Sequence, residues 1–340
     1  MNLLVTGGAG FIGCHVLRHV VDRPEVARLV NFDCLTYAGH LENVADVADH
    51  PKYRFECADL RDKSAVARAV HGHAITHVLH VAAESHVDRS IAGPDAFIHT
   101  NIVGTFNLIE ACREEWAGAD GARRFVHVST DEVYGSLGEQ DAFTEGSPIA
   151  PNSPYSASKA AGELLARAYH RTYGFPVVVT NCSNNYGPFQ FPEKLIPVAI
   201  QRLLERRPVP LYGDALHVRD WLHVRDHAEG LWLALTRGKP GETYNLGARN
   251  EWPNLRIVER LAALVDELAT ELGGGSQRLI EFVADRPGHD RRYALDPSKA
   301  ERELGWRATR DFDAGLRETV QWYLANRDWT RAVSASSPPR

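Results

Sequence analysis

The stretch LLVTGGAGFIG, residues 3–13, places a short apolar run directly before glycines at positions 7, 10 and 13. The apolar run predicts a buried strand, and the residues after the last glycine open a segment with a helical pattern. Glycine permits positive φ and lets the backbone approach a pyrophosphate closely, while the start of a helix presents free N–H groups to the phosphates. Gly7, Gly10 and Gly13 therefore predict a dinucleotide site between the first strand and the first helix.

An acid follows the second apolar run. Asp33 lies about twenty residues after Gly13, at the position where a carboxylate accepts hydrogen bonds from the adenosine ribose of a bound dinucleotide. The same charge would repel a 2′-phosphate, and Cys34 and Leu35 follow it instead of Arg or Lys. We therefore expect NAD as the cofactor in preference to NADP.

The first half of the chain alternates short Val-rich runs with helical patterns, which is typical of an open, doubly wound parallel sheet of the Rossmann type. Strands are expected over 3–6, 28–32, 76–82, 124–129 and 176–180, and helices over 62–71, 95–116 and 156–173. After Gly187 the elements become shorter and less regular. Helices are expected there over 193–205, 226–236, 254–271 and 313–327, and strands near 209–212 and 242–246.

These patterns predict an α/β fold in two parts with a terminal tail. We expect an NAD-binding domain over residues 1–187, a smaller α/β substrate-binding lobe over 188–330 with some chain exchange between the two, and a disordered tail over 331–340.

The bulk composition excludes several classes of protein. A net charge of -6 disfavours a general nucleic-acid binder. The five cysteines are odd in number and lack CxxC spacing, which disfavours a disulfide framework or a zinc site and indicates a reducing compartment. No apolar run approaches the roughly 18 residues of a membrane span. We expect a cytoplasmic protein without a metal site.

Two groups of residues carry chemistry. In VHVSTDEVYG, residues 126–135, Asp131 and Glu132 stand side by side where a strand ends. Tyr155 and Lys159 are four residues apart in a strongly helical segment, so both project from one helix face. A cation beside a phenol favours the phenolate, so we expect Lys159 to lower the pKa of Tyr155 and make it a base.

Several longer motifs are more specific than the glycine loop. They are STDEVYG, AAESHVDRS, CSNNYGPFQFPEKLIP, VRDWLHVRDH and DRPGHDRRYALD. With the glycines, Asp33 and the Tyr155–Lys159 pair, the chain closely resembles the dTDP-glucose 4,6-dehydratases of the extended short-chain dehydrogenase/reductase superfamily, from Met1 to about Trp322.

The resemblance implies a reaction that needs both an acid and a base, which explains why Asp131 and Glu132 are adjacent. Tyr155 takes the C4 hydroxyl proton of dTDP-glucose as hydride passes to NAD, and Thr130 hydrogen-bonds the same hydroxyl. Glu132 then removes the C5 proton and Asp131 protonates the departing C6 hydroxyl. Return of hydride to C6 gives dTDP-4-keto-6-deoxyglucose, so the enzyme is a hydro-lyase that keeps NAD bound.

The resemblance also implies binding residues and a homodimer made by the helices over 95–116 and 156–173. For NAD, the implied residues are Gly7, Gly10, Phe11, Ile12, Gly13, Asp33, Cys34, Leu35, Thr36, Asp59, Leu60, Ala82, Ala83, Glu84, Thr100, Ser129, Tyr155, Lys159 and Asn185. For the nucleotide sugar, they are Ser85, Thr130, Asn184, Lys194, Leu195, Pro210, Tyr212, Arg219, Asn254, Asp285, Arg286 and His289.

Other functions remain open. A UDP-hexose 4-epimerase would share the fold, NAD and the Tyr155–Lys159 pair, but has no chemical need for Asp131 and Glu132. Another nucleotide-sugar 4,6-dehydratase would keep the chemistry and change the base pocket. Departures from the family pattern at Cys34, Asn181 and Phe191 leave room for such a change of substrate. An inactive NAD-binding scaffold is the alternative from a different class.

Overall fold

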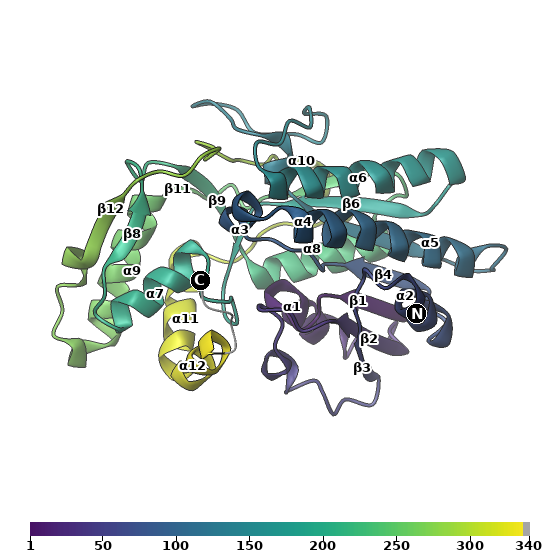
Figure 1. The fold of residues 1–340 in the computed structure, drawn as a ribbon, viewed down its shortest axis with the longest axis horizontal. Helices are drawn as coiled ribbons and strands as arrows, with labels where there is room; N and C mark the ends of the chain where they lie inside the picture. Colours follow the sequence, from purple (N-terminus) through teal and green to yellow (C-terminus); the bar gives the residue numbers. More distant parts are fainter. Residues whose placement is uncertain (336–340) are drawn as a thin grey trace.

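The computed structural model describes residues 1–335 and builds them around one large parallel sheet (Figure 1). Seven strands form this sheet in the order β10-β6-β5-β4-β1-β2-β3, and each neighbouring pair is parallel. The bounds are β1 Asn2–Thr6, β2 Arg28–Asp33, β3 Tyr53–Cys57, β4 His77–His80, β5 Arg124–Thr130, β6 Val177–Cys182 and β10 Thr243–Leu246. The expected doubly wound sheet is confirmed.

Both faces of the large sheet are apolar because helices cover both. Leu3 and Val5 of β1 pack in the cluster that contains α1 (Phe11–Val20) and α8 (Val224–Arg237). Leu4, which points to the opposite face, packs with α2 (Lys63–Gly72), α5 (Thr105–Trp116) and α6 (Pro154–Tyr173). Successive residues of a strand alternate between faces, so burial on both sides produces the continuous apolar runs seen in the sequence.

The smaller lobe contains two short sheets and a separate core. Its three-stranded sheet has the order β11-β9-β7 and its two-stranded sheet pairs β12 with β8. The strands are β7 Asn184–Tyr186, β8 Val209–Tyr212, β9 Val218–His223, β11 Glu251–Pro253 and β12 Ile280–Val283. The helices α7 (Leu195–Leu204), α9 (Asn254–Leu268) and α11 (Phe312–Ala325) bury their apolar faces against one another in this lobe.

The chain crosses between the lobes more than once. β7 lies in the small lobe although it precedes residue 187, whereas α8 and β10 return to the large sheet after it. Helix α10 (Ser298–Leu304) also packs on α8 and β10. The division at residue 187 and the chain exchange between the two parts both stay predictions.

Several local expectations differ from the structure. Five strands have no counterpart among the expected ones, namely β3, β7, β9, β11 and β12. The helix expected over 95–116 is instead α4 (Asp95–Phe97), a π-helical segment over Ile98–Gly104, and α5. The expectation of disorder from residue 331 is wrong for 331–335, because they continue α12 (Arg327–Ala335), whose Thr330 and Val333 are buried. Residues 336–340 of that expected tail lie outside the described residues.

The remaining short elements connect these units. They are α3 (Val87–Ala92) and the 3₁₀ segments over Leu41–Val44, Asp131–Tyr134, Thr270–Leu272 and Ser276–Leu279. No helix within residues 1–335 has both the length and the apolar character needed to cross a bilayer.

Candidate active site

The predicted site residues gather where the parallel strands end. β1 pairs with β2 on one side and with β4 on the other, so the strand order reverses at β1. Doubly wound sheets bind ligands in the crevice outside the carboxyl ends of the strands at such a reversal. The glycine loop follows β1, residues 82–85 follow β4, and Asp131 and Glu132 follow β5.

The glycine loop has no room for side chains. Gly7 has φ +71°, and a Cβ on it would lie 2.7 Å from the Cα of Ala82. A Cβ on Gly13 would lie 2.0 Å from the Gly7 carbonyl oxygen. Gly10 precedes α1 and offers no side-chain cap to the first turn of the helix. The loop therefore leaves backbone N–H groups at a helix start for a phosphate, which fits the expected dinucleotide.

Asp33 is fixed by the backbone around that loop. Its Oδ2 accepts a hydrogen bond from Ala9 N at 3.0 Å, and its Oδ1 accepts one from Leu35 N at 2.8 Å. Burial raises the pKa of Asp33, and these two hydrogen bonds oppose the rise. The nearby Arg61 guanidinium is paired with Asp59 at 2.6 Å. This arrangement fits a ribose with free hydroxyls better than one carrying a phosphate.

The π-helical segment joins the cofactor side to the catalytic helix. Asn101 accepts a hydrogen bond from Glu84 N at 2.9 Å and donates to Glu84 O at 2.9 Å and to Ser158 Oγ at 2.8 Å. It thus ties the loop after β4 to α6. Sequence reasoning missed Asn101, although it singled out the neighbouring Thr100, whose predicted contact with NAD is not tested by the geometry.

Helix α6 presents Tyr155 and Lys159 in its first two turns. Ser153 caps the helix in a capping box with Ser156, and Pro154 occupies its first position. Both functional side chains are buried, and Lys159 Nζ donates to Val128 O at the end of β5 at 2.7 Å. Burial lowers the pKa of Lys159 to about 8.

The expected lowering of the Tyr155 pKa is wrong in this structure. Burial, with the charges of Glu132, Cys182 and Asp131, raises the pKa of Tyr155 well above its usual value. A hydrogen bond with Thr130 opposes the rise and favours the phenolate. Lys159 donates to the carbonyl of Val128 and does not set the pKa of Tyr155. The Tyr-x-x-x-Lys spacing does not reveal this packing detail.

The adjacent acids occupy different surroundings. Thr130 Oγ1 donates to Asp131 Oδ1 at 3.1 Å and accepts from Glu132 N at 3.3 Å, so it holds both residues at the strand end. Asp131 is 2% exposed, and burial together with the charge of Glu132 raises its pKa well above the usual value. Burial also raises the pKa of Glu132, but cations oppose this rise, namely Lys194, Arg219 and Arg286. The site therefore favours a protonated Asp131 beside a more readily ionised Glu132.

Those cations come from three segments of the small lobe. Lys194 Nζ donates to Ser85 O at 2.6 Å, which bridges the two lobes. Arg219 is buried in β9, donates to Asp290 O at 2.9 Å and lies 4.3 Å from the centre of the Tyr293 ring. Arg286 pairs with Asp88 at 2.8 Å. A positive rim around buried carboxyls suits a diphosphate carried by a sugar substrate.

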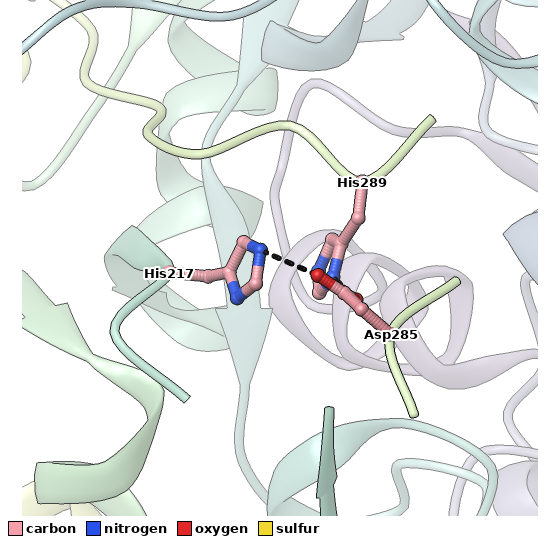
Figure 2. Close-up of side chains that lie close together, drawn as sticks. All are labelled: His217, Asp285 and His289. Atoms are coloured by element: carbon pink, nitrogen blue, oxygen red, sulfur yellow. Dashed lines mark hydrogen bonds and ion pairs between the residues drawn. The ribbon is translucent and has the colours of Figure 1, made fainter. Parts of the chain in front are cut away.

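Figure 2 shows a cluster on this rim that includes one residue not anticipated from the sequence, His217. The His217 and His289 rings stack with centroids 3.7 Å apart, and Asp285 contacts His289 Nδ1 at 2.7 Å and His217 Nε2 at 3.4 Å. Within the described residues this set could hold a metal, since its ligand atoms lie within 4.8 Å of one another. His217 directly precedes the VRDW motif, and this position was the only sequence feature that could have indicated its place in the site.

The other predicted residues lie near the carboxyl ends of the strands of the large sheet, at the start of α1 or in the small lobe. Asn185 Oδ1 accepts a hydrogen bond from His227 Nδ1 at 2.9 Å, and Asn254 N donates to His217 O at 3.0 Å. The rest are placed by their elements: Phe11 and Ile12 start α1; Cys34 and Thr36 follow β2; Leu60 follows β3; Ala83 follows β4; Ser129 ends β5; Asn184 starts β7; Leu195 starts α7; Pro210 and Tyr212 lie in β8. Their ligand contacts stay predictions.

Comparisons with known proteins cover nearly the whole chain. The family model described as GDP-mannose 4,6 dehydratase matches residues 4–319. A dTDP-glucose 4,6-dehydratase from Neisseria meningitidis is 54% identical over 340 residues, covering 98% of this chain and 96% of that protein. One from Streptomyces venezuelae, solved with NAD bound, has a TM-score of 0.91 at 47% identity and covers 98% of this chain and 100% of that chain. A UDP-glucose 4-epimerase from Thermus thermophilus, also with NAD, has a TM-score of 0.85 at 33% identity, covering 96% of this chain and 100% of that chain.

Proposed function

This chain belongs to the family described as GDP-mannose 4,6 dehydratase, and from that premise we propose that it converts dTDP-glucose to dTDP-4-keto-6-deoxyglucose with a retained NAD. It is then a lyase that uses its cofactor without net oxidation. Identity near one half to dTDP-glucose 4,6-dehydratases over almost the full length supports this substrate over that of the epimerase or the GDP-mannose enzyme.

The observation that carries the proposal is the Asp131–Glu132 pair at the end of β5. An epimerase needs only to move hydride at C4, whereas removal of water needs both a base and an acid. Burial raises the pKa of both carboxyls; the charge of Glu132 adds to the rise at Asp131, whereas three cations oppose the rise at Glu132. Two carboxyls whose pKa values are pushed apart by their surroundings supply the acid and the base of one elimination.

The steps follow from the family resemblance and from the positions of these groups. Tyr155 accepts the C4 hydroxyl proton as the phenolate, the form that its hydrogen bond with Thr130 favours against the rise in pKa caused by burial. When bound, NAD supplies the acceptor for the C4 hydride and the donor that returns it to C6. The C4 ketone makes the C5 proton acidic, and Glu132 removes it. Asp131 donates its proton to the C6 oxygen, so that water leaves, and a proton is then returned to C5.

We assign NAD and substrate to the two sides of the crevice. The loop of Gly7, Gly10 and Gly13, with Asp33, holds the dinucleotide, and the predicted cofactor residues around it complete the site. Arg219, Arg286 and the Asp285–His289 segment face the nucleotide diphosphate. The family resemblance supports these contacts, and the buried Asn184 and Asn254 oxygens without hydrogen-bond partners among the described residues lie on the substrate side.

The first experiment is incubation of the purified protein with dTDP-glucose in deuterated water without added NAD, followed by NMR and mass spectrometry. Loss of one water with deuterium at C5 is the expected result. Conversion to the galactose isomer without loss of water would make the protein an epimerase. No conversion with NAD added would contradict the assigned substrate, and GDP-mannose and CDP-glucose would then be assayed.

We also propose a cytoplasmic homodimer. Exposed apolar side chains gather on the π-helical segment, α5 and α6, and they are Ile98, Val103, Phe106, Leu164 and Tyr173. When helices of one chain leave large apolar residues exposed, a second copy of the chain is expected to bind there and bury them. The five free cysteines and the nucleotide-sugar substrate support a reducing, cytoplasmic location.

A further inference from the structure

We infer that the last helix of the small lobe, α12, fastens the glycine-rich loop through Asn43 and thereby slows the release of NAD. This inference rests on the proposed function, because it concerns a cofactor that stays bound between turnovers. Figure 1 shows α12 in yellow beside α11, on the side of the small lobe that faces α1.

A short chain of hydrogen bonds connects α12 to the loop. Trp329 Nε1 donates to Asn43 Oδ1 at 2.8 Å, and Asn43 Nδ2 donates to Ala9 O in the glycine loop at 2.8 Å. Ala9 N in turn donates to the Asp33 carboxylate at 3.0 Å. Asn43 is 1% exposed, so both of its amide atoms are engaged away from water. Trp329 is thus two hydrogen bonds from the phosphate loop and three from the ribose-binding acid.

A second contact joins the same parts. Arg18 of α1 donates to Asn43 O at 2.6 Å and its guanidinium lies 4.3 Å from the centre of the Phe189 ring. Phe189 has φ +64°, a region unfavourable for a bulky residue, and its ring packs against Trp322 and Trp329 with centroids 4.6 and 6.0 Å away. An unfavourable conformation persists where surrounding packing determines it. Aromatic packing with α11 therefore anchors α12 to the small lobe.

The arrangement makes Trp329 and Asn43 positioning residues, because neither belongs to the acid–base set. For NAD to leave, the glycine loop must loosen around the pyrophosphate. Loosening the loop disturbs the Ala9–Asn43 contact, and Asn43 is held in place by a helix of the other lobe. The link thus adds to the barrier for cofactor release while leaving the sugar-binding side unchanged.

The test compares two tryptophan-to-phenylalanine variants with matched chemistry. Trp329→Phe removes the N–H that reaches Asn43. Trp252→Phe removes an equivalent N–H, which donates to Asn250 Oδ1 at 2.7 Å in the small lobe and has no link to the glycine loop. Each protein is loaded with NAD, and the rate of NAD release is measured by trapping in excess unlabelled NAD after loading with radiolabelled NAD. One lost neutral hydrogen bond predicts release about 3- to 10-fold faster for Trp329→Phe, and wild-type release for Trp252→Phe.

A second variant tests the other link. Asn43→Asp keeps the side-chain size and replaces the donor to Ala9 O with an oxygen, so we expect release at least as fast as for Trp329→Phe. The melting temperature and the KM for the sugar at saturating NAD distinguish loosening of the loop from general destabilisation, and both should stay near wild type for Trp329→Phe. Equal release from wild type, Trp329→Phe and Asn43→Asp would overturn the inference. Absence of NAD from the purified wild type would instead contradict the retained cofactor, and the release rates from loaded protein would still decide the role of Trp329.

Discussion

Asp131 and Glu132 are consecutive residues directly after β5, and the charges around them differ. Glu132→Gln keeps the side-chain shape and removes the base. We expect turnover to fall about 10²- to 10⁴-fold, as for loss of a general base, with no deuterium entering C5. Oxidation at C4 should continue, because Tyr155 and Lys159 are unchanged. NMR of the sugar and the absorbance of reduced cofactor measure the two steps separately.

Asp131→Asn is the matched control for that experiment. It removes the proton donor for the C6 oxygen and leaves Glu132, so loss of water should slow while exchange of the C5 hydrogen continues. Deuterium entering C5 at the wild-type rate in Glu132→Gln would show that the base has been assigned to the wrong residue.

His80 provides a prediction for the dependence of stability on pH. It is buried between Thr6 and Thr105, and burial, with the charge of Lys159, lowers its pKa to about 3. Between pH 6.5 and about 3 the unfolded chain binds a proton at this histidine that the folded chain does not, so its contribution makes unfolding easier as the pH falls. In His80→Gln the slope of unfolding free energy against pH should be lower by up to about 1.4 kcal/mol per pH unit in this window. Urea unfolding at several pH values measures the slope, and an unchanged slope would contradict the shifted pKa.

At the scale of elements, α6 and the π-helical segment approach each other at Gly162. A Cβ there would lie 2.9 Å from Asn101 O and 3.3 Å from His127 Cε1. Alanine is favoured over glycine inside a helix by about 1 kcal/mol, but here it would push on the residue that holds the loop after β4. We expect Gly162→Ala to lower the melting temperature and weaken NAD binding, as measured by calorimetry.

Gly72 at the end of α2 is the control for this steric argument. A Cβ on Gly72 meets nothing within 4 Å, so Gly72→Ala should leave NAD binding unchanged and stability equal or slightly higher. Equal effects of the two substitutions would show that the contact with Asn101 has no special importance.

The elements that sequence predicts best are those whose own residues decide them. The Val-rich strands, the glycine loop and the Ser153-capped helix α6 depend on local patterns, and all are found where expected. β3 was missed because the exposed Arg54 and the half-buried Glu56 interrupt the apolar run of an edge strand. The π-helical segment was missed because a change of hydrogen-bond register leaves the apolar spacing of 95–116 nearly intact.

In the site, too, some features follow from local sequence and others depend on tertiary contacts. The positions of Tyr155, Asp131 and Glu132 followed from motifs, whereas the raised pKa of Tyr155 depends on burial by residues from several elements. His217, Asn43 and Asn101 escaped notice because each acts through contacts with distant segments. Such residues carry no local signature, since their partners are chosen by the tertiary fold.

At the scale of the whole molecule, the helix pair that leaves apolar residues exposed predicts association. Leu164, on α6, is 50% exposed. Leu164→Glu places a charge on this surface and should shift the protein towards monomers, which sedimentation velocity would detect. Phe282 in β12 is 57% exposed on a different part of the molecule, so Phe282→Glu should leave association unchanged. A wild-type protein that is monomeric at micromolar concentration would contradict the dimer.

The late return of β10 to the large sheet has a consequence for synthesis. β6 has β5 on one side, but its other neighbour is not made until the ribosome has passed Leu246. At about 5–20 residues per second, the segment from Cys182 to Thr243 takes several seconds to emerge, and during that time the free edge of β6 is open to pairing with other chains. Nascent molecules are therefore most prone to aggregate in this interval, and ribosome-associated chaperones would protect them most when they bind before β10 arrives.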